Sequence, residues 1–239
     1  MRLLILVPAL VLAACNATSH AADTAGQSGA SATQRTFDVG EFHSVALGGS
    51  NDVIVQVGGA RSIRAEGAAE ALDRLDIHVE NGVLKIGQKH DSIWSGHRVA
   101  TVYVTAPALD GASVGGSGSM RIDSISGRHF DASVGGSGNL SVGTVKVDDA
   151  SFSLGGSGNL KAAGAASSIK VSVAGSGDLD VGALDARNAS VSLAGSGDAV
   201  VRASDNATLS LIGSGDITVH GTAKCSVSKM GSGDARCLG

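Results

Sequence analysis

Apolar and polar residues alternate on both sides of a Gly-Ser-Gly tripeptide that recurs through the second half of the chain. In nearly every copy, an apolar side chain stands two and four residues before the first glycine and four and six residues after it. A period of two is typical of a strand with one buried face. Each copy is therefore predicted to form two short strands joined by a bend at the glycines.

The tripeptide returns at a nearly constant interval. Its first glycines are 20, 20, 19, 20, 18 and 18 residues apart and lie at Gly116, Gly136, Gly156, Gly175, Gly195, Gly213 and Gly231. A hairpin would leave the inner face of each strand pair without a partner, whereas stacked coils place each repeat on a similar neighbour. We therefore predict an all-β fold, a β-solenoid (β-helix) of stacked coils of about 20 residues.

Two polar columns accompany the repeat. A serine stands three residues before the first glycine of every copy, and serine, asparagine or aspartate stands three residues after it. The second column ends in four aspartates, Asp178, Asp198, Asp216 and Asp234. Because such side chains bond local backbone groups at bends, we interpret this column as a structural turn ladder.

An earlier copy of the template contains Gly49, with Asn51 in place of the second glycine, so the repeats begin near residue 36. Residues 58–110 depart from the template. Within them we expect a short helix over Ala68–Leu75, a hairpin over Leu75–Gly87 that turns at Asn81-Gly82, and a strand over Arg98–Ala106. Residues 36–110 are thus predicted as an elaborated N-terminal part before regular repeats over residues 111–239. The pattern leaves open whether residues 58–110 form a separate lobe.

Trp94 lies in a predicted loop of this N-terminal part. It is either an exposed anchor for a partner or a loop residue that folds back on the sheet, and we favour the second interpretation.

The chain starts with a basic residue, a short apolar run and small residues that lead to Cys15. This arrangement predicts an export signal over residues 1–14, because the run is too short to span a membrane. The segment Leu12-Ala13-Ala14-Cys15 resembles the lipobox of bacterial lipoproteins, which implies that Cys15 is lipidated; the alternative is an ordinary secretory signal. By the same resemblance, Asn16 points to the outer membrane. Residues 15–34, rich in small and polar residues, are predicted to form a flexible tether.

Cys225 and Cys237 lie six residues before and six residues after the first glycine of the last repeat. Strands folded about that turn would bring them together, as a disulfide requires, and an exported protein meets an oxidising compartment. A metal pair or a redox couple lacks further ligands at suitable spacing. We therefore predict a structural disulfide that supports a terminal repeat, in which Lys229 replaces an apolar residue.

Charge and composition exclude one class of partner. The net charge is −4, with both signs scattered along the chain, and aromatic residues make up only 3%. The sequence therefore offers neither a basic stripe nor a set of stacking platforms for nucleic acid.

Several segments together resemble the bacterial head GIN domain family of auto-transporter adhesin heads. They are Phe42-His43-Ser44-Val45, Gly49-Ser50-Asn51-Asp52-Val53, the strand Val102–Leu109, the Gly-Ser-Gly-Asp series and the terminal segment from Cys225 to Cys237. The resemblance covers roughly residues 36–238. It implies a β-helical fold and a place in the cell envelope, and it implies no catalytic residue.

The sequence therefore predicts a lipid-anchored, non-enzymatic module of the cell envelope, adhesin-like, periplasmic or surface-facing, that binds the membrane through its lipid and contacts an envelope protein or glycan. No cofactor and no metal are predicted. One alternative is an enzyme acting on polysaccharide, but repeated aspartates resemble turn chemistry more than a catalytic pair, and the histidines share no spacing that suggests a site. Another alternative is a calcium-stabilised surface module, because stacked carboxylates repel one another unless something offsets their charge.

Overall fold

The computed structural model describes residues 33–89 and 99–239, and most of these residues lie in β-strands. The predicted signal peptide, Cys15 and Trp94 lie outside the described residues, as does most of the predicted tether. Thr33 and Gln34, which composition places in the tether, belong instead to strand β1 (Thr33–Phe37). They are held by antiparallel pairing with β4 (Ser62–Gly67), a tertiary contact that local composition does not reveal.

The remaining elements follow in chain order. They are β2 Ser44–Gly49, β3 Asp52–Val57, α1 Ala69–Asp73, β5 Leu75–Glu80, β6 Val83–Gln88, β7 Thr101–Ala106, β8 Gly111–Gly116, β9 Ser119–Ser126, β10 His129–Gly136, β11 Asn139–Gly156, β12 Asn159–Gly175, β13 Asp178–Gly195, β14 Ala199–Gly213, β15 Ile217–His220, β16 Lys224–Gly231 and β17 Ala235–Leu238.

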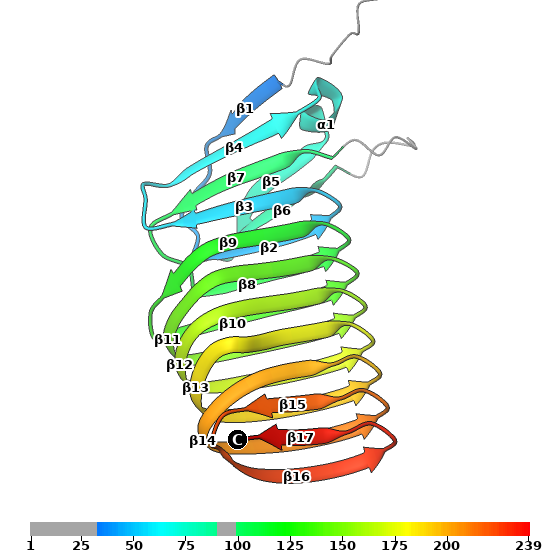
Figure 1. The fold of residues 1–239 in the computed structure, drawn as a ribbon. Coiled ribbons are helices and arrows are strands. Elements are labelled where there is room, and N and C mark those ends of the chain that lie inside the picture. Colours follow the sequence, from blue (N-terminus) through cyan, green and yellow to red (C-terminus); the bar gives the residue numbers. More distant parts are fainter. Residues whose placement is uncertain (1–32, 90–98) are drawn as a thin grey trace, which may run out of the picture. The chain divides into compact units, whose positions relative to one another are not determined.

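The regular repeats stack as the sequence predicts. Each copy pairs with the next in parallel and in register, so that Gly136 lies between Gly116 of the previous tier and Gly156 of the following tier. In Figure 1 the Gly-Ser-Gly bends form one file along the right-hand side of the stack. The predicted β-solenoid is therefore confirmed.

The strands themselves are longer than predicted. Each of β11, β12, β13 and β14 runs without interruption for 15 to 18 residues, from one Gly-Ser-Gly bend to the next. The expected pair of short strands is instead one strand that curves from one face of the solenoid to the other, because parallel pairing continues around the curve. The solenoid consequently has a turn edge, formed by the Gly-Ser-Gly bends, and a corner edge, formed by residues 126–127, 146–148, 165–167, 185–187, 202–204 and 221–222.

Close stacking explains why the bends carry two glycines. The first has a positive φ, as at Gly175 (φ +137), a conformation that other residues rarely adopt. The second has no such φ, but a Cβ added to Gly177 would lie only 2.1 Å from the backbone oxygen of Gly158 in the previous tier. The turn edge is therefore packed backbone against backbone.

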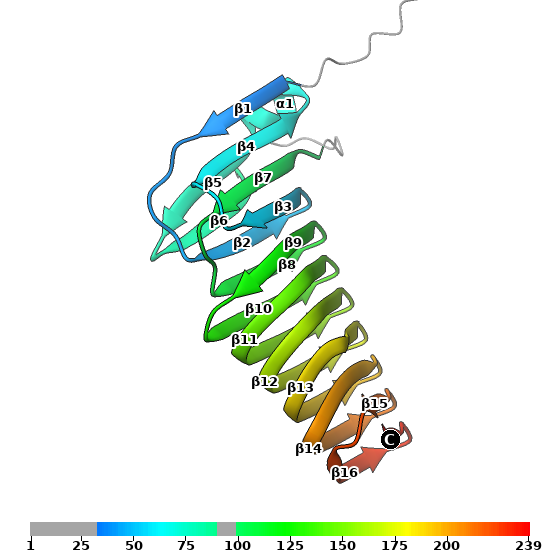
Figure 2. The ribbon, with the colours of Figure 1, turned by 60° about the vertical axis from the view of Figure 1, so that its left-hand side comes forward.

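The N-terminal part belongs to the same stack and forms no separate lobe. Strands β2 and β3 pair with β8 and β9 on one side and with β6 and β7 on the other, all in parallel. Figures 1 and 2 accordingly show β3 between β7 and β9, although β7 comes later in the chain. The chain thus builds two tiers out of sequence order before the regular winding begins at β8.

Local predictions for this part are confirmed. Helix α1 lies within the expected segment, and β5 and β6 form an antiparallel hairpin. Asn81 (φ 52) and Gly82 (φ 74) occupy its turn with the positive φ values that a two-residue hairpin loop favours.

One bend departs from the template at Asn51, which replaces the second glycine and is 1% exposed. The Oδ1 of buried Asn51 accepts a hydrogen bond from the backbone N–H of Ala100 (3.2 Å). The amide thus links the first bend to the tier above it.

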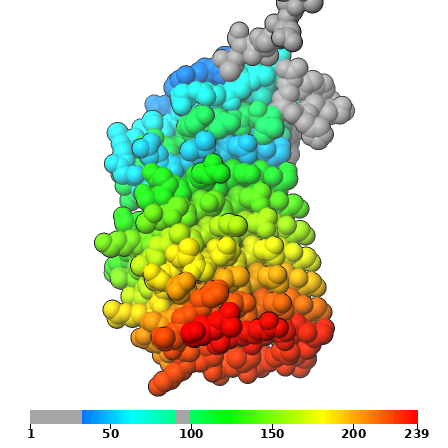
Figure 3. Space-filling model, in the orientation of Figure 1, coloured from blue at the N-terminus to red at the C-terminus, as the bar shows by residue number. Residues whose placement is uncertain are grey.

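The core consists of the predicted inward columns. Phe130 and Phe152 are fully buried between the two faces, as are the aliphatic residues of neighbouring tiers. The columns lose their cover at the last tier, where Val227 is 48% exposed. Figure 3 shows this tier, coloured red, at the end of the stack.

Candidate functional site

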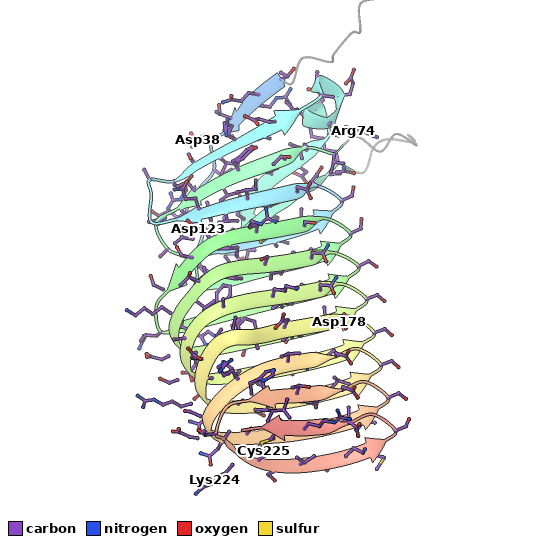
Figure 4. The ribbon with its side chains drawn as sticks, in the orientation of Figure 1. Asp38, Arg74, Asp123, Asp178, Lys224 and Cys225 are labelled. Carbon is purple, nitrogen blue, oxygen red and sulfur yellow. A yellow bond between two sulfur atoms is a disulfide. The ribbon has the colours of Figure 1, made fainter. Side chains whose placement is uncertain are left out.

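The predicted turn ladder forms at the turn edge, where Figure 4 labels Asp178. Oδ1 of Asp178 accepts a hydrogen bond from the backbone N–H of Asp198 in the next tier (3.2 Å). Asp198 and Asp216 accept in the same way from Asp216 (2.9 Å) and Asp234 (2.8 Å). The first three carboxylates of the series thus each bond the backbone of the following tier.

This geometry indicates a structural role for the aspartates. A backbone N–H donor offsets part of the repulsion between stacked carboxylates, and at the last tier Arg236 and Lys229 hold the pKa of Asp234 below its usual range. Further along the column, Asn159 donates to Asn139 (2.9 Å), so the neutral members bond each other in the same file. Among residues 33–89 and 99–239, no group of three or more potential metal ligands is suitably placed.

The corner edge is hollowed instead of packed. A groove of about 900 Å³ runs along it from Ser126 to Thr222. Its floor is a column of small buried side chains in register, Val147, Ala166, Ala186 and Ala203. We call this feature the corner groove.

Charged side chains border the corner groove. Arg202 donates to the backbone oxygen of Gly182 (3.1 Å) and lies 3.6 Å from Asp185, so these two charges largely neutralise each other. Lys146 and Arg187 also line the groove, and the described residues offer neither side chain a hydrogen bond or an ion pair.

A second hollow of about 320 Å³ adjoins the groove, with which it shares Ser126 and Gly127. His43 and His129 both line it, together with Arg128. The chain positions of these histidines suggest no site, yet the out-of-order tiers bring them to the same hollow.

Three polar residues beside this hollow have the composition of a hydrolytic triad but not its geometry. Asp110 Oδ1 lies 2.9 Å from both His43 Nδ1 and Ser44 Oγ. Ser44 Oγ is 3.2 Å from that same nitrogen, whereas the Nε2 side of the ring faces Gly82. A relay needs serine on the nitrogen opposite the carboxylate, so this cluster does not activate Ser44.

The cluster does lower the pKa of Asp110. Partial burial raises the pKa of this carboxyl, but the hydrogen bonds from His43 and Ser44 outweigh burial and hold the pKa below its usual value. Asp110 is therefore ionised at neutral pH and acts as the acceptor that ties β2 to the start of β8.

Cys225 and Cys237 form a disulfide in the last tier, with 6.7 Å between their Cα atoms. It joins β16 to β17, the two strands that the final bend connects, and Figure 4 labels Cys225 near the start of β16. Lys229, which replaces an apolar residue there, lies 3.5 Å from Asp234.

The repeat pattern in the sequence predicted the turn edge but did not predict the groove at the corner edge. Its recurrent columns identified the glycines and the aspartate ladder, whereas Lys146 and Arg187 occupy no recurrent position. One available signal was the interval between bends, which varies from 20 to 18 residues. Because the bends are uniform, this variation has to be absorbed between them, where the groove lies.

Comparisons with known proteins agree with this architecture. Residues 41–223 match the family model described as "Putative auto-transporter adhesin, head GIN domain". A search of curated proteins found no significant match. Within the part of the chain that the structure describes, no helix has the length and apolar character needed to cross a membrane.

Several solved structures share the fold. A structure from Bacteroides fragilis, titled a putative adhesin, is 21% identical with a TM-score of 0.82, covering 87% of this chain and 97% of its own. A putative adhesin from Parabacteroides distasonis is 19% identical with a TM-score of 0.72 and the same coverages. A structure from the same species titled "Putative lipid binding protein" is 24% identical with a TM-score of 0.67, also over 87% and 97%.

Proposed function

The chain belongs to the head GIN domain family, and from this premise we propose that it is a lipid-anchored binding module of the bacterial cell envelope, adhesin-like and non-enzymatic. The observation that carries the proposal is the corner groove, an open hollow of about 900 Å³ along one edge of the solenoid. Rigid strands on both sides preorganise the groove, so little conformational entropy is lost when a partner binds.

The anchoring part of the proposal rests on the sequence. Cys15 follows a lipobox-like segment after a short apolar run, and residues up to 32 are mostly small and polar. A lipid on Cys15 would hold the domain at a membrane, and the segment that follows would let it reach a partner.

The non-enzymatic part rests on the chemistry of the hollows. The aspartates of the ladder bond backbone groups, and Ser44 lies on the wrong side of the His43 ring for activation. The remaining charged residues of the corner groove are better suited to hold a charged ligand than to transfer a proton.

A Cys15→Ala variant tests the anchor. In a bacterium that processes lipoproteins, the wild-type chain should take up an alkyne-labelled fatty acid and fractionate with the outer membrane, whereas the variant should do neither. Protease treatment of intact cells then distinguishes a surface-facing domain from a periplasmic one. Equal lipid incorporation in the variant would contradict anchoring through Cys15.

Adhesion is tested on cells that carry the wild-type chain or a deletion. Cells with the wild-type chain should retain more envelope protein or glycan from a neighbouring cell than the deletion strain, and added Cys15→Ala chain, which lacks the lipid, should compete. No difference between the strains would contradict a binding role. Turnover of a uronic-acid or neutral glycan by the purified protein would contradict the non-enzymatic role.

A further inference from the structure

Among the described residues that line the corner groove and the adjoining hollow, the charged side chains without a partner are mainly positive. Lys146 and Arg187 on the groove, and Arg128 in the adjoining hollow, have no partner among the described residues. Asp185 is neutralised by Arg202, which leaves Asp148 as the groove-lining carboxylate without a described partner. This excess of positive charge favours an occupant that carries carboxylates.

The groove is long and open. It crosses the tiers from Ser126 to Thr222, five steps of about 4.8 Å, or on the order of 24 Å. An extended polypeptide advances about 3.3 Å per residue, so roughly seven residues would fill it. A hydrocarbon chain would stay largely exposed to water there, because the bordering residues Lys146, Ser167 and Arg187 are themselves exposed.

The chemistry of the lining favours a peptide over a sugar chain. The floor is aliphatic, from Val147 to Ala203, and suits small aliphatic side chains. Hydroxyls of Ser167, Ser204 and Thr222 lie along the groove and can donate to or accept from a peptide backbone. No aromatic ring, the usual platform for a sugar ring, is among the described residues that line it.

We infer that the corner groove binds an extended acidic segment of a partner protein. The inference rests on the proposed binding function and names the chemistry of its ligand. Carboxylates of the segment contact Lys146 and Arg187, and small aliphatic side chains lie on the alanine floor. Asp148 opposes binding through like-charge repulsion.

The test uses the full chain in detergent and a fluorescein-labelled peptide of alternating glutamate and alanine, about ten residues long. Fluorescence anisotropy should show binding that weakens as salt is raised. Lys146→Gln and Arg187→Gln should each weaken it roughly two- to fivefold, and Asp148→Asn should strengthen it by a similar factor. Lys161→Gln and Lys170→Gln remove the same charges from neighbouring faces outside the groove and should change nothing.

A variant that leaves the charges intact gives an independent test. Ser167 is exposed in the groove wall, so Ser167→Trp should fill the groove without disturbing the core and should abolish binding. Circular dichroism and the melting temperature should match those of the wild type.

Three outcomes would overturn the inference. They are no binding of the acidic peptide, equal losses in the Lys161 and Lys170 controls, and an oligogalacturonate that competes more tightly than the peptide. The first two leave the adhesion result untouched, and the third assigns the groove to a glycan. Loss of adhesion in cells, by contrast, would remove the proposed function itself.

Discussion

The two long edges of the solenoid differ in how regularly the repeat is maintained. At the turn edge each bend repeats the last, and the backbones approach so closely that a Cβ on Gly177 would meet the Gly158 oxygen at 2.1 Å. Directly before the corner edge, matching positions differ from tier to tier: Gly164, whose added Cβ would also meet backbone, is aligned with Val145 and with Leu184. Register shifts interrupt the pairing before this edge and, in β13, at the edge itself.

This difference shows that stacking requires uniform glycine bends but permits variation in length and sequence at the corner edge. The turn edge sets the distance between tiers and leaves no room for a side chain between the stacked glycines. The corner edge tolerates insertions and deletions of one or two residues, so charge and shape can vary there without loss of the fold. Function on such a fold is expected where the repeat is irregular.

The largest expected effect comes from breaking the turn edge. Gly177→Ala should destabilise the domain by at least ~3 kcal/mol, or prevent folding, because the new methyl group overlaps backbone that cannot move without shifting a whole tier. Urea denaturation measures the loss.

Two matched variants complete this test. A Cβ on Gly135 would meet nothing within 4 Å, so Gly135→Ala should stay within about 0.5 kcal/mol of the wild type. Ala165→Ser, on the corner edge, should be equally mild. A tolerant Gly177→Ala would show that the bends are not packed as closely as described.

The next effect concerns the end of the stack, where neither edge has a following tier. The Cys225–Cys237 disulfide closes a sequence separation of 12 residues, for which chain entropy predicts a stabilisation of about 3 kcal/mol. Replacing both cysteines by serine should raise hydrogen exchange in β16 and β17 and leave β10 protected, because each tier contacts only its neighbours. Ser228→Ala, on the exposed face of β16, serves as the control. Uniform loss of protection along the solenoid would contradict tier-by-tier stability.

The same contrast explains how much could be predicted from sequence. Period-two alternation and the glycine spacing predicted the stacked tiers, since each signal recurs and one chance match cannot mimic it. The places of Thr33 in β1 and of His43 and His129 in one hollow depend on pairings between distant segments, which local patterns do not encode. The corner groove could not be predicted for a further reason. It forms where side chains are small and the repeat is interrupted, so no recurrent signal marks it.

A smaller effect is expected in the aspartate ladder. Asp198→Ala removes the acceptor of the Asp216 N–H (2.9 Å) and should cost about 1 kcal/mol, whereas Asp198→Asn keeps an oxygen there and should be nearly neutral. Because backbone donors already bond these carboxylates, a chelator or added calcium should leave the melting temperature unchanged. A rise in melting temperature with calcium, lost in Asp198→Asn, would instead favour the calcium-stabilised alternative.

The smallest effect is a pH dependence at Asp110, where the irregular N-terminal tiers meet the regular ones. Hydrogen bonds from His43 and Ser44 hold its pKa below the usual value despite partial burial. A carboxyl with a lowered pKa in the folded state adds stability above its unfolded pKa, and this stability is lost as the pH falls through the folded pKa. Since the Asp110 side chain is 56% exposed, the contribution should stay below about 1 kcal/mol.

Urea denaturation from neutral to acid pH should therefore show Asp110→Asn slightly less stable than the wild type at neutral pH and equal to it at acid pH. The control is Asp149→Asn, which changes an exposed aspartate without a described partner; its stability relative to the wild type should not depend on pH. If Asp110→Asn were less stable than the wild type by the same amount at every pH, packing and not charge would join β2 to β8.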